Sequence, residues 1–515
     1  MCGIFALLSE ESKDIGSLKA ISDKSSHRGP DSSKNVVFHS DNGNAYLFFH
    51  RLSINGLNEK SNQPMCLNDL NWITLMCNGE IYNYKELAKK YDIDLQTDSD
   101  CEIIIHLYSK LPVGKFINEL DGVFSFVIYD KYQEALFVGH DPLGVRPLYW
   151  YTNDDNSEIC FSSEMKSLYG MSNNIQFYPP GSYSHYYMKT KTLHTYSYYN
   201  FNYPLIEDND EGNIVKIIKN KLEKSVKKRL ITDRPFGCLL SGGLDSSVIV
   251  SIISKFIEPS KINTFAIGLE GSPDLVAARK VADHIGTNHT NVVVSEEDML
   301  NAIDETIYQI ESYDTTTVRA SVPMFLLAKY IRKNTDIKVI FSGEGSDEAS
   351  GSYLYFHKAP DAKDFQDECI RLLKDVRYFD ILRGDKTISG AGLELRVPFF
   401  DKEFLNYYMG INPELKMVRD GMEKYLLRKS FENDLPQDIV WRRKDGFSDG
   451  VSSQNRPWYE IIEEYTHDKY SLSEKDYYIS VFNKYYEGCE RIIPYQWMPK
   501  WVDGVGDNPS GRLIE

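Results

Sequence analysis

Residues 236–257 carry the pattern that most limits how this chain can fold. An apolar run at 236–240 leads into Ser241-Gly242-Gly243-Leu244-Asp245-Ser246-Ser247, and an apolar helical period then continues to residue 257. The two glycines let backbone N–H groups approach a ligand closely, and the start of the helix adds its positive end. The pattern therefore predicts a strand, a phosphate-binding turn and a helix, which together form the repeating unit of a parallel α/β sheet.

The acidic residue in this turn indicates that a metal ion binds here together with the phosphate. The hydroxyls of Ser241, Ser246 and Ser247 can donate to phosphate oxygens, whereas the carboxylate of Asp245 would repel them. Because a carboxylate in a phosphate cradle is expected to hold a cation, and Mg²⁺ prefers oxygen ligands, we expect Mg²⁺ here. The turn lacks the GxxxxGK[ST] spacing of a Walker loop. The simpler alternative is a Ser/Gly turn that only caps the helix.

A second glycine-rich turn follows another predicted strand. Strands are predicted at 264–269 and 338–341, alternating with helical periods, which indicates a parallel sheet with helices on both faces. Ser342-Gly343-Glu344-Gly345-Ser346-Asp347-Glu348 comes directly after the second of these strands. Because ligands bind such sheets at the carboxyl ends of strands, the two turns can face one site. We expect Asp347 to be a second Mg²⁺ ligand and Glu344 to lie beside the reacting group, unless this is merely an acidic surface turn.

The first 203 residues follow a different pattern. Short apolar or alternating runs at 45–50, 72–77, 122–130 and 135–140 are bounded by turn residues and predict strands. The acidic stretch 205–213 is interpreted as a linker, and a helical period runs from 214 to 230. A chain of 515 residues is too long for one hydrophobic core. We therefore predict two domains, 1–203 and 204–515, the second of which ends in a mainly helical region.

The bulk properties exclude several classes of protein. The formal net charge of -17 argues against a nucleic-acid partner, which needs a basic footprint. No apolar run approaches the ~18 residues of a membrane span, and the N-terminus lacks the basic region of a signal peptide. The eight cysteines are scattered without a CxxC pair, so no zinc site or disulfide framework is predicted. We expect a cytoplasmic protein with small-molecule substrates and no membrane partner, and a homodimer is left open.

The N-terminus offers a candidate nucleophile. The chain begins Met1-Cys2-Gly3-Ile4-Phe5, so removal of Met1 would give Cys2 a thiol and a free α-amine on the same carbon. An α-amine has a pKa of about 7.7–8, so it can act near neutral pH as the base that activates the thiol. Taken alone, this triplet favours the start of an ordinary chain. The rest of the sequence favours the nucleophile.

Further motifs accompany these features in a definite order. The first half contains His27-Arg28-Gly29-Pro30-Asp31, Arg51-Leu52-Ser53-Ile54, Asn78-Gly79-Glu80-Ile81-Tyr82-Asn83 and Asp98-Ser99-Asp100-Cys101-Glu102. The second half adds Val318-Arg319-Ala320-Ser321, Gly392-Leu393-Glu394-Leu395-Arg396-Val397-Pro398-Phe399 and Trp441-Arg442-Arg443-Lys444. In this combination the chain resembles the family of glutamine-dependent asparagine synthetases over nearly its whole length. The resemblance implies an α+β N-terminal nucleophile (Ntn) sandwich domain, followed by an α/β doubly wound parallel-sheet ATP pyrophosphatase (PP-loop) domain.

In the first half the resemblance implies a glutamine site. Cys2 would attack the side-chain amide carbon of glutamine, and the Asn78 amide with the Gly79 N–H would hold the oxyanion. Charged side chains would bind the α-groups of glutamine. Arg51 would bind its α-carboxylate, and Asp100, helped by Glu80, would bind its α-ammonium. As alternatives, isolated residues such as Arg51 and Asp100 are often surface ions, and Asn78-Gly79 is also a strong hairpin-turn signal.

In the second half the resemblance implies that ATP activates the side-chain carboxylate of aspartate, giving β-aspartyl-AMP and pyrophosphate. Asp245 and Asp347 would hold Mg²⁺, while Lys444, assisted by Lys424, would offset charge on the phosphates. ATP contacts are expected from Leu240, Ser241, Gly242, Gly243, Leu244, Asp245, Ser246, Ser247, Ile267, Ser342, Gly343 and Lys444.

The remaining implied roles concern aspartate and ammonia. Thr316, Thr317 and Arg319 would lie near the aspartate, unless they are only a helix start with a surface arginine. Glu344 would contact the aspartate and take a proton from ammonia as a general base, staying ionised beside Mg²⁺ and Lys444. Ammonia released in the first domain would reach the second through an apolar channel.

Two rival functions are weighed against this resemblance. A β-lactam synthetase shares the adenylation chemistry, but that family tends to lack the N-terminal cysteine and to place a tyrosine near the position of Glu344. A non-catalytic relative would show substitutions at Cys2, Asp245, Asp347 or Lys444, and this chain keeps all of them. One departure from the family pattern is Ala349-Ser350-Gly351-Ser352, which stands where bulkier apolar residues and two glycines are usual.

Overall fold

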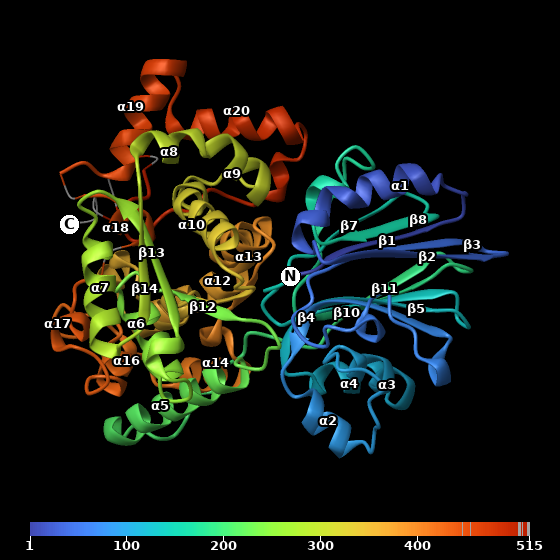
Figure 1. The fold of residues 1–515 in the computed structure, drawn as a ribbon, viewed down its shortest axis with the longest axis horizontal. Coiled ribbons are helices and arrows are strands. Elements are labelled where there is room, and N and C mark those ends of the chain that lie inside the picture. Colours follow the sequence, from blue (N-terminus) through green and yellow to red (C-terminus); the bar gives the residue numbers. More distant parts are fainter. Residues whose placement is uncertain (445, 454, 503–505, 507, 512–515) are drawn as a thin grey trace.

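Three β-sheets in two adjoining parts organise the chain (Figure 1). The computed structural model describes residues 1–444, 446–453, 455–502, 506 and 508–511. The first sheet is antiparallel and contains β2 (Ser32–Ser40), β3 (Gly43–Arg51), β1 (Gly3–Ser9), β8 (Glu158–Ser162), β7 (Tyr149–Thr152) and β9 (Gln176–Phe177) in that order. The second is also antiparallel and contains β11 (Thr192–Ser197), β10 (Ser182–Tyr187), β6 (Ala135–His140), β5 (Gly122–Asp130) and β4 (Ile73–Ile81).

These two sheets pack face to face between layers of helices. Because successive side chains of a strand point to opposite faces, Ile4 and Leu8 of β1 pack with Met76 of the other sheet, whereas Phe5 and Leu7 point away from it. Helix α1 (Ile15–Ser22) covers the first sheet, and α2 (Tyr84–Lys90), α3 (Glu102–Lys110) and α4 (Val113–Glu119) cover the second. The predicted α+β sandwich is therefore confirmed, although the strand pattern did not reveal these helices.

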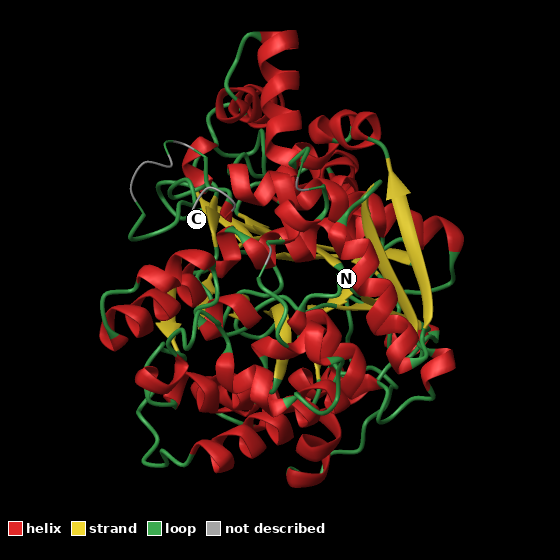
Figure 2. Cartoon of the chain, turned by 90° about the vertical axis from the view of Figure 1, so that its left-hand side faces the viewer, coloured by secondary structure: helices red, strands yellow, loops and turns green. Residues whose placement is uncertain are grey.

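The third sheet is parallel, as predicted. Its order is β14 (Asn288–Val294), β13 (Asn263–Leu269), β12 (Phe236–Leu239), β15 (Val339–Phe341) and β16 (Glu394–Arg396). Helices α6 (Leu244–Ile253) and α7 (Pro273–Ile285) cover one face, and α10 (Thr315–Asn334) and α13 (Asp380–Gly390) cover the other (Figure 1). Figure 2 shows this part of the chain from its outer side, with strands among helices. The strand order reverses between β12 and β15, which is where ligands of doubly wound sheets bind.

Helices make up most of the rest of the second part. They are α5 (Glu211–Lys228), α8 (Glu296–Asn301), α9 (Ile303–Ile310), α11 (Ser346–Ser350), α12 (Ala362–Asp375), α14 (Lys402–Gly410), α15 (Pro413–Lys416), α16 (Tyr425–Ser430), α17 (Gln437–Val440), α18 (Phe447–Gly450), α19 (Trp458–Tyr470) and α20 (Glu474–Tyr486). The prediction of a mainly helical C-terminal region is confirmed. Among the described residues, no helix combines the length and the apolar character needed to cross a membrane.

Several boundaries differ from the sequence predictions, and two of these differences bear on the domain division and on a predicted turn. The predicted linker 205–213 is shorter, because the Asp210 side chain accepts the Asn213 N–H at 2.9 Å and α5 begins at Glu211. The strand expected at 72–77 continues to Ile81, so Asn78-Gly79 is part of a strand and not a hairpin turn. A Cβ atom on Gly79 would lie 2.3 Å from the carbonyl oxygen of the neighbouring strand, so only glycine fits there.

Candidate active sites

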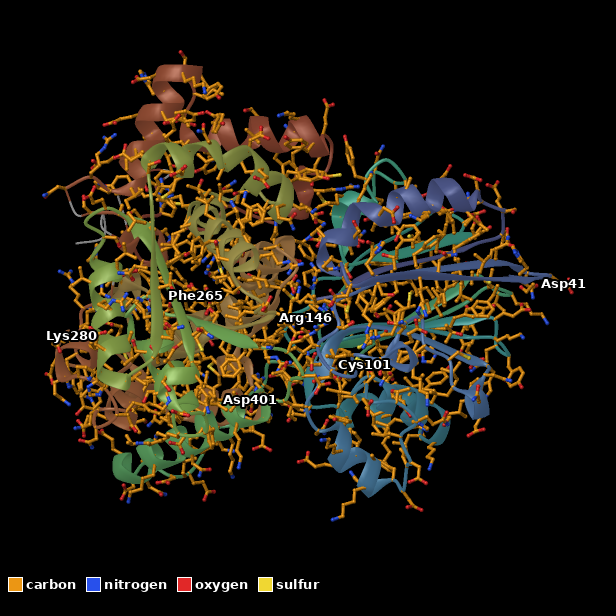
Figure 3. All side chains as sticks on the ribbon, viewed as in Figure 1. Asp41, Cys101, Arg146, Phe265, Lys280 and Asp401 are labelled. Carbon is orange, nitrogen blue, oxygen red and sulfur yellow. The ribbon has the colours of Figure 1, made fainter. Side chains whose placement is uncertain are left out.

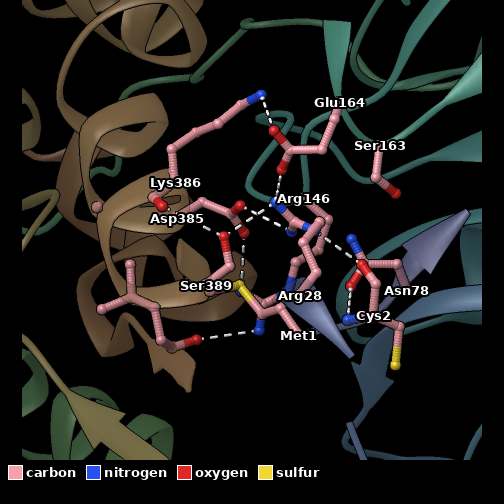
Figure 4. Close-up of polar contacts among 12 residues, drawn as sticks. Met1, Cys2, Arg28, Asn78, Arg146, Ser163, Glu164, Asp385, Lys386 and Ser389 are labelled. Atoms are coloured by element: carbon pink, nitrogen blue, oxygen red, sulfur yellow. Dashed lines mark hydrogen bonds and ion pairs between the residues drawn. The ribbon is translucent and has the colours of Figure 1, made fainter. Parts of the chain in front are cut away.

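The N-terminus lies at the junction of the two parts (Figure 1), and Cys2 lies beside the start of β1 (Figure 4). Its backbone N–H donates to Asn78 Oδ1 at 2.8 Å, and its thiol lies 3.7 Å from the Leu52 carbonyl oxygen. Burial raises the pKa of the Cys2 thiol. With Met1 attached, the Cys2 nitrogen is a peptide N–H, so only removal of Met1 would supply the free amine.

Asn78 has the chemistry expected of an oxyanion donor. Its side-chain nitrogen is buried and has no hydrogen-bond partner among the described residues, although its oxygen is occupied by the Cys2 N–H. A buried donor without a partner costs about 1–3 kcal/mol, which an accepting ligand would recover. Cys2 and Asn78 are therefore brought together as predicted, with one donor left for a ligand.

The Arg51 guanidinium is buried beside this pair and orders the loop that follows β3. It donates to the carbonyl oxygens of Asn55 at 3.0 Å and Gly56 at 2.5 Å, and to the Asn62 side chain at 2.9 Å. Part of its hydrogen-bonding capacity is therefore used within the protein. Arg51 reaches the region of Cys2, yet the structure also assigns it a role in shaping the loop.

The two predicted carboxylates of this site are also buried. Asp100 accepts the Ile81 N–H at 2.7 Å, and Glu80 accepts from the Asn55 side chain at 2.6 Å. Burial raises the pKa of Asp100 to about 6, although the Ile81 N–H opposes the shift. Burial together with Asp100 raises the pKa of Glu80, although Arg396 at 3.4 Å opposes it. The ionisation of both carboxylates therefore responds to pH and to a cationic ligand.

A second candidate site is a cavity of about 230 Å³ at the carboxyl ends of β12, β13 and β15. The predicted residues that line it are Leu240, Ser241, Gly243, Leu244, Asp245, Ser246, Ile267, Thr316, Ser342, Gly343, Glu344, Asp347 and Lys444, together with Lys424. Gly242, Ser247, Thr317 and Arg319 do not line it. The cavity therefore gathers residues from both glycine-rich turns at the reversal of the sheet.

Two glycines of these turns allow the backbone to approach its neighbours closely. A Cβ atom on Gly343 would lie 2.9 Å from both the Cβ atom of Asp245 and the backbone nitrogen of Ser246. At Gly242, where φ is +74°, a Cβ atom would lie 2.4 Å from the backbone of α7. The Ser346 hydroxyl then donates to Asp245 Oδ1 at 2.6 Å and ties the second turn to the first. Backbone approach therefore explains why glycine is required at these positions.

One ammonium group lies between the two predicted metal ligands. Lys424 Nζ donates to Asp245 Oδ2 at 2.6 Å and to Asp347 Oδ1 at 2.5 Å, and Lys444 Nζ donates to Asp347 Oδ2 at 2.6 Å. Burial opposes ionisation of Asp347, but Lys424 and Lys444 outweigh it and lower its pKa far below the usual range. The Ser352 hydroxyl, part of the departure from the family pattern, also donates to Asp347. The two carboxylates thus enclose a position that holds a cation, and their oxygens suit Mg²⁺.

Glu344 has a different partner from the one predicted. The sequence placed Lys444 beside it, but Lys444 is engaged by Asp347, and Glu344 pairs instead with Arg383 of α13. Burial raises the pKa of Glu344, although Arg383 opposes the shift. Arg383 and its second partner Asp380 line the cavity and were missed by the sequence analysis, because an arginine within a helix has no motif of its own.

The predicted aspartate-binding residues are only partly brought to the cavity. Thr316 lines it with a hydroxyl that has no hydrogen-bond partner among the described residues. The Thr317 hydroxyl instead donates to Asp314 at 2.8 Å, and Arg319 pairs with Glu474 of α20. Neighbouring helix positions point in different directions, so three residues this close in sequence cannot all face one cavity.

Comparison with known proteins identifies a family for each half of the chain. The glutamine amidotransferase domain model matches residues 1–221, and the asparagine synthase model matches residues 218–366 and 359–491. The asparagine synthetase [glutamine-hydrolyzing] of Homo sapiens is 40% identical over 567 residues, covering 100% of this chain and 98% of the relative. The protein of the same name from Gallus gallus is 39% identical over 571 residues, covering 100% and 99%.

The chain belongs to the glutamine-hydrolysing asparagine synthetase family. It is an enzyme of the ligase class, and ATP is the nucleotide of this family, as the resemblance implied. The matches favour neither a β-lactam synthetase nor a non-catalytic relative. The glutamine amidotransferase match covers the antiparallel sandwich, and the asparagine synthase match covers the parallel sheet.

Proposed function

We propose that residues 1–203 release ammonia from glutamine at Cys2 and that residues 204–515 use it to amidate aspartate. The observation that carries the synthetase half is the meeting of two glycine-rich turns at neighbouring parallel strands, where Asp245 and Asp347 enclose one cation position. The boundary at 203/204 is supported by the absence of strand or helix between β11, ending at Ser197, and α5, beginning at Glu211.

In the glutamine half, removal of Met1 gives Cys2 the amine that can take the thiol proton. The thiolate attacks the amide carbon, and the Asn78 side-chain nitrogen and the Gly79 N–H stabilise the oxyanion. The Asn78 nitrogen, which has no partner in the described part of the chain, supports this assignment. Arg51 binds the glutamine α-carboxylate, and Asp100 with Glu80 binds its α-ammonium.

In the synthetase half, the first turn cradles the phosphates of ATP through its backbone N–H groups and its serine hydroxyls. Asp245 and Asp347 would hold Mg²⁺, which when bound neutralises phosphate charge and orients the leaving pyrophosphate. Lys424 must then leave the position between them, while Lys444 remains to offset negative charge. Thr316 offers the aspartate a hydroxyl that no other described residue engages. Glu344 accepts the proton that ammonia loses on attacking β-aspartyl-AMP.

In this proposal, ammonia passes between the halves through the space that Met1 occupies before its removal. The Met1 side chain is 1% exposed and belongs to an apolar cluster with Leu52, Leu143, Val145 and Leu393, which come from both halves. Its removal would free the amine of Cys2 and leave apolar space beside it. Neutral ammonia favours such a route because water would protonate it.

The setting of the reaction is also part of the proposal. All eight cysteines are free, which suits the reducing cytoplasm. The homodimer left open by the sequence stays a prediction, which light scattering of the purified chain would test.

One isotope experiment tests the whole function. Glutamine labelled with ¹⁵N in its side-chain amide is incubated with aspartate, Mg-ATP and the full chain lacking Met1. We expect ¹⁵N-labelled asparagine, glutamate, AMP and pyrophosphate. Asparagine that carries only unlabelled nitrogen from the buffer would contradict ammonia transfer within the protein, and ADP in place of AMP would contradict adenylation.

A further inference from the structure

The carbonyl group of the candidate nucleophile is held by a buried arginine. Arg28 is fully buried, and its Nε donates to the Cys2 carbonyl oxygen at 2.8 Å (Figure 4). The N–H of Cys2 is held by Asn78. Both polar groups of the Cys2 backbone are therefore fixed, so a shift of Arg28 would move the backbone that carries the thiol.

Arg28 is in turn held by the synthetase half. Its Nη1 donates to the Ser389 hydroxyl at 3.0 Å and to Glu164 at 2.6 Å, and its Nη2 pairs with Asp385 at 2.8 Å. Burial opposes the charge of Arg28, but Asp385 and Glu164 outweigh it and raise its pKa above the usual range. Ser389 and Asp385 both belong to α13, so two of the partners of this guanidinium come from the other half of the chain.

Helix α13 is anchored to the glutamine half a second time and also reaches the synthetase cavity. Lys386 donates to Glu164 at 2.8 Å, and both side chains are fully buried. One turn earlier in the same helix, Arg383 pairs with Glu344. The helix that supports Arg28 therefore contacts the candidate general base as well. Arg146, which pairs with Asp385 at 3.4 Å, lies at the same junction (Figure 3).

We propose that Asp385 and Ser389 are positioning residues for glutamine hydrolysis, acting through Arg28 on the Cys2 backbone. The inference rests on the proposed role of Cys2 as nucleophile. Displacement of a reacting group by about 1 Å can cost 10²-fold in rate, so a loosened Arg28 should lower the rate of attack more than the binding of glutamine. Glutamine hydrolysis thus depends on side chains from the synthetase half.

The test compares two hydroxyl deletions in the full chain lacking Met1. The Thr387 hydroxyl donates to the carbonyl oxygens of Arg383 at 2.8 Å and Gly384 at 3.5 Å, and the Ser389 hydroxyl donates to that of Lys386 at 3.4 Å, so each variant loses hydrogen bonding within α13. Only Ser389→Ala also loses the hydrogen bond that Arg28 donates to the Ser389 hydroxyl. We expect Ser389→Ala and Asp385→Asn to lower kcat for glutamine hydrolysis about tenfold while KM stays within about twofold. Thr387→Val should match the wild type, and Ser389→Thr should recover most of the rate.

Two further measurements separate positioning from a general loss of structure. Iodoacetamide should alkylate Cys2 more slowly in Ser389→Ala than in Thr387→Val across the pH range, at similar melting temperatures. Wild-type kcat in a folded Ser389→Ala variant would overturn the proposal, as would an equal loss in Thr387→Val. If Asp385→Asn does not fold, the Ser389→Ala result decides. Retention of glutamine hydrolysis by Cys2→Ala would instead overturn the proposed function.

Discussion

Glu344 and Arg383 form a two-point ion pair, with Nη1 3.1 Å from Oε1 and Nη2 2.8 Å from Oε2. Burial raises the pKa of the Glu344 carboxylate above its ordinary value, while Arg383 favours the charged form and limits the rise. A general base works best when its pKa lies near the operating pH, so these opposing influences suit proton transfer. The pair also fixes the direction of the carboxylate toward the cavity.

Replacing Glu344 with Gln should therefore remove the base while keeping the shape of the side chain. A positioned general base contributes about 10²–10⁴-fold, so asparagine formation at saturating Mg-ATP should fall by that order. Glutamine hydrolysis should change far less. A near-wild-type rate of asparagine formation would exclude the general-base role, and a raised ATP requirement with a normal maximal rate would indicate nucleotide binding instead.

Replacing Cys2 with Ala should abolish the use of glutamine and spare asparagine formation from ammonium salts. The reason is that the proposed nucleophile serves only the first site. Cys66→Ala is the matched control, because it removes an exposed thiol from the same half of the chain. Both nitrogen sources are assayed for each variant, and equal loss of the two activities in Cys2→Ala would contradict separate sites.

Replacing Asp245 or Asp347 with Ala should abolish Mg²⁺-dependent pyrophosphate release and leave glutamine hydrolysis measurable. Each change removes one carboxylate from the cation position and leaves Lys424 with a single partner there. Asp438→Ala, which removes an exposed carboxylate paired with Lys280, serves as the control. Continued pyrophosphate release by both cavity variants would exclude the metal assignment.

Asp100 should make glutamine use sensitive to mild acid. Its carboxylate must be ionised to pair with an α-ammonium, and its pKa is about 6. The value of kcat/KM for glutamine should therefore fall about tenfold for each pH unit below that pKa, since this parameter reports the free enzyme. A flat pH profile between 5 and 7, or a profile unchanged in Asp100→Asn, would contradict the assignment.

The same pKa predicts that acid affects stability in the opposite direction: acid lowers glutamine use but favours the folded state. Because the folded-state pKa of Asp100 lies above the unfolded value, its stabilising contribution is complete in acid and is lost as the pH rises through about 6. Asp100→Asn should consequently melt at a higher temperature than the wild type at pH 7 while using glutamine less well. A lower melting temperature at pH 7 would show that the buried carboxylate stabilises the fold when ionised.

Several features of the fold and sites follow from the sequence itself. The Ser241–Ser247 turn and the strands at 122–130 and 135–140 depend on residues that are close together in the chain. Hydrophobic periodicity and the need for glycine at a tight approach are properties of short segments, so they can be read locally. This is why the parallel sheet and its two turns were predicted correctly.

The partners of the buried charges were decided only by the tertiary structure. Arg383 beside Glu344, Lys424 between two carboxylates, and Asp385 beside Arg28 join residues far apart in the sequence. No local pattern specifies which of several cations a buried carboxylate will meet, because that depends on how helices pack and which way each side chain points. The sequence thus determined the chemistry available at each site, and packing between the two halves determined which groups meet there.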